Sequence, residues 1–216
     1  MDVLDSKESG EKYRLQVDGL GYDVEIPYVL IPTRDGNIRI ASFNLIGQTR
    51  LNCDLGRLLA ERIRREVVDY QSLVVLTAVE KALQLTQVVS SELGIDAVAV
   101  AYNRIKPHME VERRPVIQVG ADSITSGDKF LALYERDMQL LASAQNGYII
   151  IDDVVSTGGT VFGLYEIIEE AAARAGIDSP KVHGIFCAAT EGNTGVRLPA
   201  PVHSLARLPV PQKVMS

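Results

Sequence analysis

The sequence is poor in the residues that build disulfide frameworks and metal clusters. It has two cysteines, Cys53 and Cys187, and three histidines among 216 residues. Two lone thiols without CxxC spacing are typical of buried residues in a reducing compartment, and the histidines lack the spacing of metal ligands. Positive charge is not in excess either, because the formal net charge is −6. That balance argues against binding to nucleic acid or to anionic membranes through a general positive field.

Long apolar runs and the common phosphate-binding motifs are also missing. No run approaches the roughly 18–20 residues that a membrane helix needs, and the polar, acidic start, MDVLDSKESG, does not resemble a signal peptide. We therefore expect a cytoplasmic protein without a membrane partner. The sequence contains neither GxxxxGK[ST] nor a GxGxxG after a strand, which argues against Walker-type and dinucleotide-binding loops.

Hydrophobic patterning alternates between short apolar runs and segments of helical period. It predicts helices at 54–68, 81–94 and 160–176, with Asp54 as the N-cap of the first. It predicts strands at 72–79, 96–102, 146–153 and 181–189. This alternation indicates an α/β fold, with a mostly parallel central sheet, helices on both faces, and ligands bound at the carboxyl ends of the strands.

The remaining segments are expected to surround this core within a single domain of residues 1–216. The core is expected at about 50–190, and residues 1–13 are polar and expected to be loose. Strand-like segments on both sides of an Asp35-Gly36 turn signal, about 14–48, are expected to form a small β-rich hood with the tail, about 191–212. The long charged stretch at about 103–130 predicts a flexible loop, with short strands at 115–119 and 129–133.

The most distinctive segment is YIIIDDVVSTGGT, residues 148–160. An apolar strand leads to Asp152 and Asp153, and a turn rich in Ser, Thr and Gly then leads into a helix. Glycines let main-chain N–H groups approach a ligand, and a helix N-terminus favours an anion, so the turn predicts a phosphate site. Two carboxylates would repel phosphate. Hydrogen bonds to the hydroxyls of an attached sugar would explain them, and a nearby magnesium ion is a second possibility.

This segment resembles the signature of type I phosphoribosyltransferases, which bind phosphoribosyl pyrophosphate (PRPP). The resemblance extends over most of residues 70–190 and implies the type I phosphoribosyltransferase fold and a homodimer. It implies that Asp152 and Asp153 contact the ribose hydroxyls. It implies Mg²⁺ as cofactor, bound through PRPP, with the same two carboxylates as candidate ligands. It also implies a loop that wraps the 5-phosphate and consists of Val155, Ser156, Thr157, Gly158, Gly159 and Thr160.

A second segment, LTAVEKALQL, aligns with the pyrophosphate loop of purine-type members. The alignment implies that Val79, Glu80 and Lys81 form this loop. Lys81 matches the basic position of the family pattern. Val79, Glu80, Ala82 and Gln84 depart from it.

A third segment, AYNRIKPHM, resembles the basic entry to the family's flexible loop. Arg104 and Lys106 match in type and place. Together with Lys81 they are the candidate catalytic residues, because their charges would neutralise pyrophosphate as it leaves. The flexible loop would then shield the reacting sugar from water.

The resemblance implies an enzyme, a PRPP-dependent pentosyltransferase that forms a nucleoside 5-monophosphate and pyrophosphate from PRPP and a free purine. A small residue at Ser156 and the β-rich hood favour adenine. PRPP and a nucleobase are therefore the expected partners. The base-binding residues stay unassigned, and Phe186, Glu191 and His203 are candidates only by location. Two alternatives stay open, a regulator that senses PRPP on the same fold without turnover, and a phosphoribosyltransferase for orotate or another pyrimidine.

Overall fold

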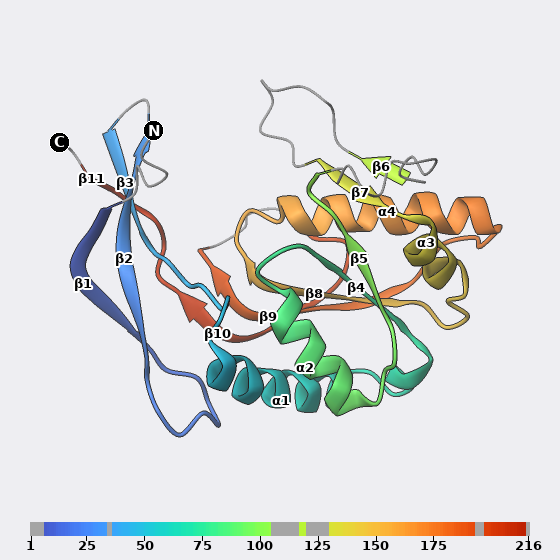
Figure 1. The fold of residues 1–216 in the computed structure, drawn as a ribbon, viewed down its shortest axis with the longest axis horizontal. Helices are drawn as coiled ribbons and strands as arrows, with labels where there is room; N and C mark the ends of the chain where they lie inside the picture. The colour runs from blue at the N-terminus through green and yellow to red at the C-terminus, as the bar shows by residue number, and fades with distance from the viewer. Residues whose placement is uncertain (1–6, 34–35, 105–116, 120–129, 193–196, 215–216) are drawn as a thin grey trace.

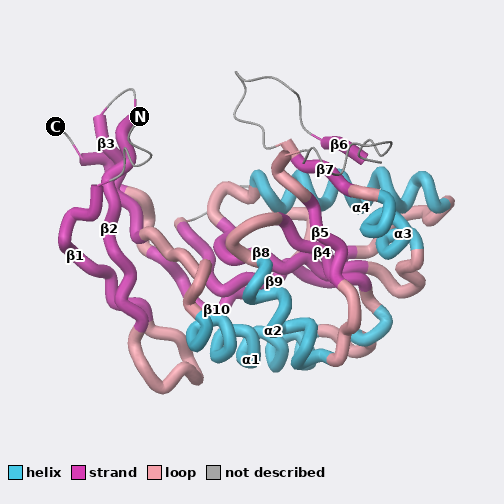
Figure 2. Tube along the Cα trace, viewed as in Figure 1, coloured by secondary structure: helices cyan, strands magenta, loops and turns pink. Residues whose placement is uncertain are grey.

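The computed structural model describes residues 7–33, 36–104, 117–119, 130–192 and 197–214. Its strands form a five-stranded sheet, a four-stranded sheet and a two-stranded ribbon. Figure 2 shows the strands of the four-stranded sheet at one end of the molecule and those of the five-stranded sheet among the helices. The described strands are β1 (Lys7–Leu15), β2 (Val24–Thr33), β3 (Gly36–Ala41), β4 (Val74–Ala78), β5 (Val98–Ala101), β6 (Ile117–Val119), β7 (Leu131–Leu133), β8 (Tyr148–Val155), β9 (Val182–Glu191), β10 (Val202–Leu208) and β11 (Gln212–Val214).

The five-stranded sheet has the order β10-β9-β8-β4-β5, and all neighbouring strands run parallel. The helices are α1 (Thr49–Glu66), α2 (Leu83–Leu93), α3 (Glu135–Ala142) and α4 (Gly159–Ala175). Figure 1 shows α1 and α2 on one side of the sheet and α3 and α4 on the other. The sequence predicts this mostly parallel sheet, because strands that are covered on both faces are continuous apolar runs. The fold class is confirmed.

The first helix begins earlier than the sequence predicts. The expected N-cap, Asp54, lies inside α1 rather than before it. Its carboxylate accepts a hydrogen bond from the Tyr22 hydroxyl at 2.8 Å, a contact that no local pattern predicts. The buried Asn52 amide donates to the Leu45 carbonyl at 2.6 Å and fixes the chain just before the helix.

The four-stranded sheet, order β1-β2-β3-β11, forms the hood, and its neighbouring strands run antiparallel. Two expectations need correction. Residues 1–13 were expected to be loose, yet β1 begins at Lys7 and its backbone pairs with β2. The tail, 191–212, is expected to join the hood, but its strand β10 is an edge strand of the core sheet, and of the described strands in the tail only β11 pairs with a hood strand, β3. Alternating apolar and polar residues predict a strand but do not indicate which strand it pairs with. The sequence of the tail therefore does not show which sheet β10 joins.

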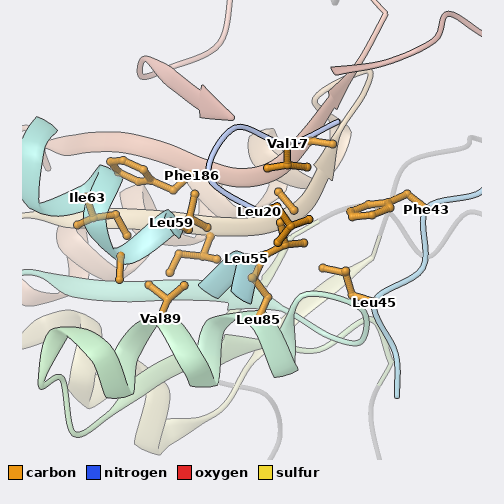
Figure 3. Close-up of a cluster of buried hydrophobic side chains, with 14 of the residues drawn as sticks. Val17, Leu20, Phe43, Leu45, Leu55, Leu59, Ile63, Leu85, Val89 and Phe186 are labelled. Carbon is orange, nitrogen blue, oxygen red and sulfur yellow. The ribbon is translucent and has the colours of Figure 1, made fainter. Parts of the chain in front are cut away.

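A continuous hydrophobic cluster joins the hood to the core (Figure 3). Leu20 and Phe43 from the hood region pack with Leu55 and Leu59 of α1 and with Phe186 of β9. Each large apolar side chain buried in this way contributes roughly 1.5–3 kcal/mol to the free energy of unfolding. The same hydrophobic cluster therefore holds the hood on the core and α1 against the sheet.

The expected flexible loop falls mostly outside the described residues. Its two predicted short strands are confirmed in part, because β6 and β7 pair antiparallel, with Ile117 opposite Leu133. The short helix α3, which follows β7, is not predicted. None of the helices in the described ranges has both the length and the apolar character that a membrane crossing requires.

Candidate functional site

A cavity of about 430 Å³ lies where the carboxyl ends of the core strands meet the hood. Because the core strands are parallel, residues far apart in the sequence reach the same edge of the sheet. The lining residues are Ile40, Ala41, Ser42, Phe43, Ala78, Val79, Glu80, Lys81, Ala82, Asn103, Asp152, Asp153, Val154, Ser156, Thr160, Glu191 and Leu208.

The two predicted ribose-binding carboxylates lie together in this cavity. β8 continues two residues beyond the pair, so Asp152 and Asp153 are held by strand geometry rather than by a loop. Asp152 is only 6% exposed, and one of its oxygens accepts a hydrogen bond from the Asp153 N–H at 2.9 Å. The Thr77 hydroxyl donates to the Ile151 carbonyl at 2.8 Å and ties β4 to β8 just below the pair.

The predicted phosphate loop forms a small hollow of about 30 Å³, lined by Asp152 and residues 154–161. Gly158 precedes α4 with φ of 84°, and no side chain caps the helix. The first N–H groups of an α-helix have no carbonyl partner within the helix, and the helix dipole adds partial positive charge there. A Cβ on Gly158 would lie 2.6 Å from a Leu198 methyl carbon, whereas a Cβ on Gly159 would meet only Thr157 Oγ1, at 3.8 Å. The hollow therefore presents main-chain donors with little side chain around them.

The predicted pyrophosphate loop, Val79, Glu80 and Lys81, lines the same cavity, directly after β4. The Val79–Glu80 peptide bond is cis, and the Val79 N–H donates to the Ala101 carbonyl at 2.9 Å. Glu80 and Lys81 are exposed to the cavity, while Ala82 is buried behind them. All three loop residues thus lie at the same edge of the sheet as the Asp pair.

The two other candidate catalytic residues are placed less closely. Arg104 follows β5 and is exposed, and it is not among the residues that line the cavity. Lys106 lies outside the described residues. Of the two expected cations that the structure describes, Lys81 lines the cavity and Arg104 does not.

The remaining side of the cavity is lined by residues after β3 of the hood and by the ends of the core strands β9 and β10, and of these residues the sequence names only Glu191, as a base-contact candidate by location. Ser42 and Phe43 follow β3, and Leu208 ends β10. Glu191 ends β9, opposite Leu208 in the strand register, and burial raises the pKa of its carboxyl. The signal for this position in the sequence is its location at the end of a largely apolar strand, and its place beside Leu208 appears only in the folded chain.

The two other base-contact candidates, Phe186 and His203, and the thiol of Cys187 lie away from the cavity. Phe186 is fully buried and stacks on His203, with ring centroids 4.8 Å apart, and neither residue lines the cavity. Burial lowers the pKa of His203. Cys187 is also fully buried, and burial together with the nearby Asp152 charge raises the pKa of its thiol. Such a thiol stays protonated and is no nucleophile.

The described cavity wall is rich in carboxylates, with Glu80, Asp152, Asp153 and Glu191 against the single ammonium of Lys81. Among the described residues, no cluster of three or more His, Cys, Asp or Glu side chains is arranged to hold a metal by itself. Magnesium in proteins is commonly held by one or two carboxylates together with substrate phosphates. The Asp pair therefore fits a magnesium ion that a diphosphate substrate brings with it.

The parallel sheet, the β hood and the strand-turn-helix with its Asp pair together define the fold. The chain has the type I phosphoribosyltransferase fold with an additional β hood. No family model matches the sequence, and no curated protein matches it in sequence. The assignment of the fold therefore rests on three-dimensional similarity.

Solved structures of adenine phosphoribosyltransferases are similar to this chain. The enzyme from Thermoanaerobacter pseudethanolicus gives a TM-score of 0.52 at 13% identity, over 84% of this chain and 95% of that one. The APRTase from Giardia lamblia, complexed with 9-deazaadenine, gives a TM-score of 0.53 at 15% identity, over 83% of this chain and 93% of that one. The enzyme from Trypanosoma brucei, in complex with AMP, pyrophosphate and ribose 5-phosphate, gives a TM-score of 0.51 at 14% identity, over 78% of this chain and 70% of that one.

Proposed function

We propose that this protein is a Mg²⁺-dependent phosphoribosyltransferase that transfers the 5-phosphoribosyl group of PRPP to a purine, with adenine favoured, and releases pyrophosphate. The observation that supports it most strongly is the meeting of three features in one place. The Asp152–Asp153 pair, the open N-terminus of α4 and the loop after β4 share one edge of the sheet. A sugar with a phosphate on one end and a diphosphate on the other needs these three kinds of contact.

In this proposal the sugar phosphate is held by geometry already present in the chain. The carboxylates of Asp152 and Asp153 accept hydrogen bonds from the two ribose hydroxyls, since ionised carboxylates are acceptors only. The 5-phosphate takes the N–H groups of the loop at residues 155–160, together with the hydroxyls of Ser156, Thr157 and Thr160. Because these groups are fixed before binding, they can hold the anomeric carbon in position for transfer.

The leaving pyrophosphate lies in this proposal along the loop of Val79, Glu80 and Lys81. The Lys81 ammonium stabilises the developing negative charge, with Arg104 and Lys106 as further cations from the segment after β5. Magnesium, when bound, supplies additional charge neutralisation on the diphosphate oxygens. The acidic balance of the wall makes such neutralisation necessary, because Glu80 alone would repel the leaving group.

The acceptor base is proposed to occupy the hood side of the cavity. Phe43, Ile40 and Leu208 offer apolar surface there for the faces of a flat ring. The Giardia and Trypanosoma neighbours were solved with 9-deazaadenine and with AMP, which supports a purine of the adenine type. A homodimer stays a prediction from the family resemblance.

A second candidate function is a PRPP sensor without turnover. Glu80 favours it, because this residue departs from the family pattern and faces the cavity in the pyrophosphate loop. A carboxylate there weakens the stabilisation of departing pyrophosphate. Binding of PRPP would survive through the Asp pair and the loop before α4.

The deciding experiment measures pyrophosphate release from PRPP and Mg²⁺ by the full chain, with adenine, hypoxanthine, guanine, xanthine and orotate tested separately. Release that depends on adenine would establish the proposed reaction. Release only with orotate would replace the purine with a pyrimidine. PRPP binding by calorimetry without release for any base would establish the sensor, and absence of PRPP binding would refute both functions.

A further inference from the structure

The hood side of the cavity combines apolar surface with very few polar side chains. The lining there consists of Ile40, Ala41, Phe43 and Leu208, with a hydroxyl from Ser42 and a carboxyl from Glu191. An apolar pocket takes the faces of any flat base with similar affinity, and polar groups at its edge decide which base fits. Glu191 is the one charged residue among these lining groups of the hood side.

The Glu191 side chain has no bonding partner among the described residues. No hydrogen bond or ion pair joins it to any of them, and the neighbouring Arg207 donates instead to the Gly192 carbonyl, at 3.1 Å. It is half-buried, and burial raises the pKa of its carboxyl. A half-buried carboxyl that finds no donor within the described part of the chain contributes little to folding, so a ligand explains the position better than stability does.

The strand register fixes where Glu191 lies relative to the sugar contacts. β8 and β9 are neighbours, Val155 pairs with Thr190, and Glu191 is the next residue along β9. Its other neighbour in the register is Leu208 of β10. Glu191 therefore lies in the strand register between β8, which carries the Asp pair, and Leu208 on the apolar side, and it lines the cavity with both.

We infer that Glu191 is a specificity-determining residue, whose carboxyl accepts a hydrogen bond from the 6-amino group of a purine and rejects 6-oxopurines. The inference deepens the proposed function and rests on it. A carboxyl oxygen pairs with an amino N–H, whereas a 6-oxo group would set two acceptors against each other. When a 6-oxopurine binds, the half-buried carboxyl of Glu191 has no hydrogen-bond donor. The difference in binding free energy between the two kinds of purine is therefore larger than the free energy of one hydrogen bond.

The test uses AMP, IMP and GMP as probes, because AMP and IMP share the ribose 5-phosphate and differ in the 6-substituent, and because binding needs no turnover. Isothermal calorimetry on the full chain is expected to show about 10- to 100-fold tighter binding of AMP than of IMP. In Glu191→Gln the ratio falls to about 3-fold or less, because an amide can accept from an amino group and also donate to an oxo group. In Glu191→Leu, AMP binds as weakly as IMP. The matched control, Glu61→Gln, changes an exposed carboxylate of α1 and keeps the wild-type ratio.

The outcomes separate this inference from the proposed function on which it rests. If ribose 5-phosphate and PRPP bind but the AMP-to-IMP ratio survives Glu191→Gln, the role of Glu191 is refuted while the proposed function stands. Tighter binding of IMP or GMP than of AMP by the wild type refutes it as well. If neither PRPP nor ribose 5-phosphate binds, the proposed function fails. Thermal melting of each variant verifies that the fold is intact.

Discussion

The phosphate hollow before α4 allows a substitution that separates ligand binding from folding. Gly159 is the first residue of α4, it does not adopt a left-handed conformation, and an added Cβ would meet only Thr157 Oγ1, at 3.8 Å. Gly159→Ala is therefore expected to leave the free energy of unfolding unchanged or to raise it by up to about 1 kcal/mol, because alanine restricts the unfolded chain.

The same methyl group would occupy space on the lining of a hollow of only about 30 Å³. A phosphate kept out of position loses at least one hydrogen bond of its charged oxygens, worth about 1.5–3 kcal/mol. Gly159→Ala is thus expected to raise the dissociation constants of PRPP and ribose 5-phosphate by about 10- to 100-fold. Calorimetry measures the affinity, and urea unfolding measures the stability of the same samples.

Two glycines at the ends of the same helix serve as comparisons. Gly158→Ala combines a left-handed φ of 84° with a Cβ 2.6 Å from Leu198, so it is expected to lower stability and affinity together. Gly176→Ala has a φ of 70° without a close neighbour, so it costs about 1–2 kcal/mol of stability and leaves affinity unchanged. An unchanged affinity in a folded Gly159→Ala variant would refute the assignment of the hollow to phosphate.

Three further predictions concern carboxyl groups. Replacing Asp152 and Asp153 together with Asn is expected to weaken PRPP binding by at least about 100-fold in calorimetry while far-UV circular dichroism and Tm stay near the wild type, and unchanged affinity would refute the ribose assignment. Burial raises the pKa of Glu191 above the unfolded value, so the wild type loses stability as the pH rises through the folded pKa. The Tm of Glu191→Gln should accordingly equal that of the wild type below about pH 4 and exceed it at pH 8, and equal Tm values at pH 8 would contradict this. Asp137 accepts a hydrogen bond from the Val100 N–H at 3.1 Å. Asp137→Ala is therefore expected to lower the free energy of unfolding, measured in urea, by about 1–3 kcal/mol. Asp137→Asn is expected to keep most of the wild-type stability, because its amide oxygen can accept the same bond.

The core sheet could be predicted because its strands are covered on both faces. β4 begins with three consecutive buried apolar residues and β8 with four, so their sequence alone marks them as strands. β1 has the sequence KESGEKYRL and is held by backbone pairing with β2, which leaves no apolar pattern to read. Asp54 has the chemistry of an N-cap, but the distant Tyr22 hydroxyl binds it. Contacts between distant segments overrule local preference at these two places.

The candidate site also has one part that the sequence predicts and one part that it does not. The Asp pair and the glycine-rich turn lie within one contiguous segment, so spacing alone predicts that they act together. Glu191 gains its position only when the end of β9 meets β10 and the hood, and a lone glutamate after an apolar strand has many ordinary explanations. The phosphosugar half of the cavity can thus be read from local sequence, and the half that would choose the base cannot.

The composition of the hood sheet has a consequence for the order of assembly. Strand β11 pairs with β3, with Gln212 opposite Arg39, so this ladder joins segments on either side of the whole core. The hood sheet therefore cannot be completed before every strand of the core sheet has been synthesised. The residues of the Asp pair and of the phosphate hollow precede Leu208 and β11 in the chain. The segments proposed to hold the sugar phosphate are thus all made before the cavity wall on the hood side is complete.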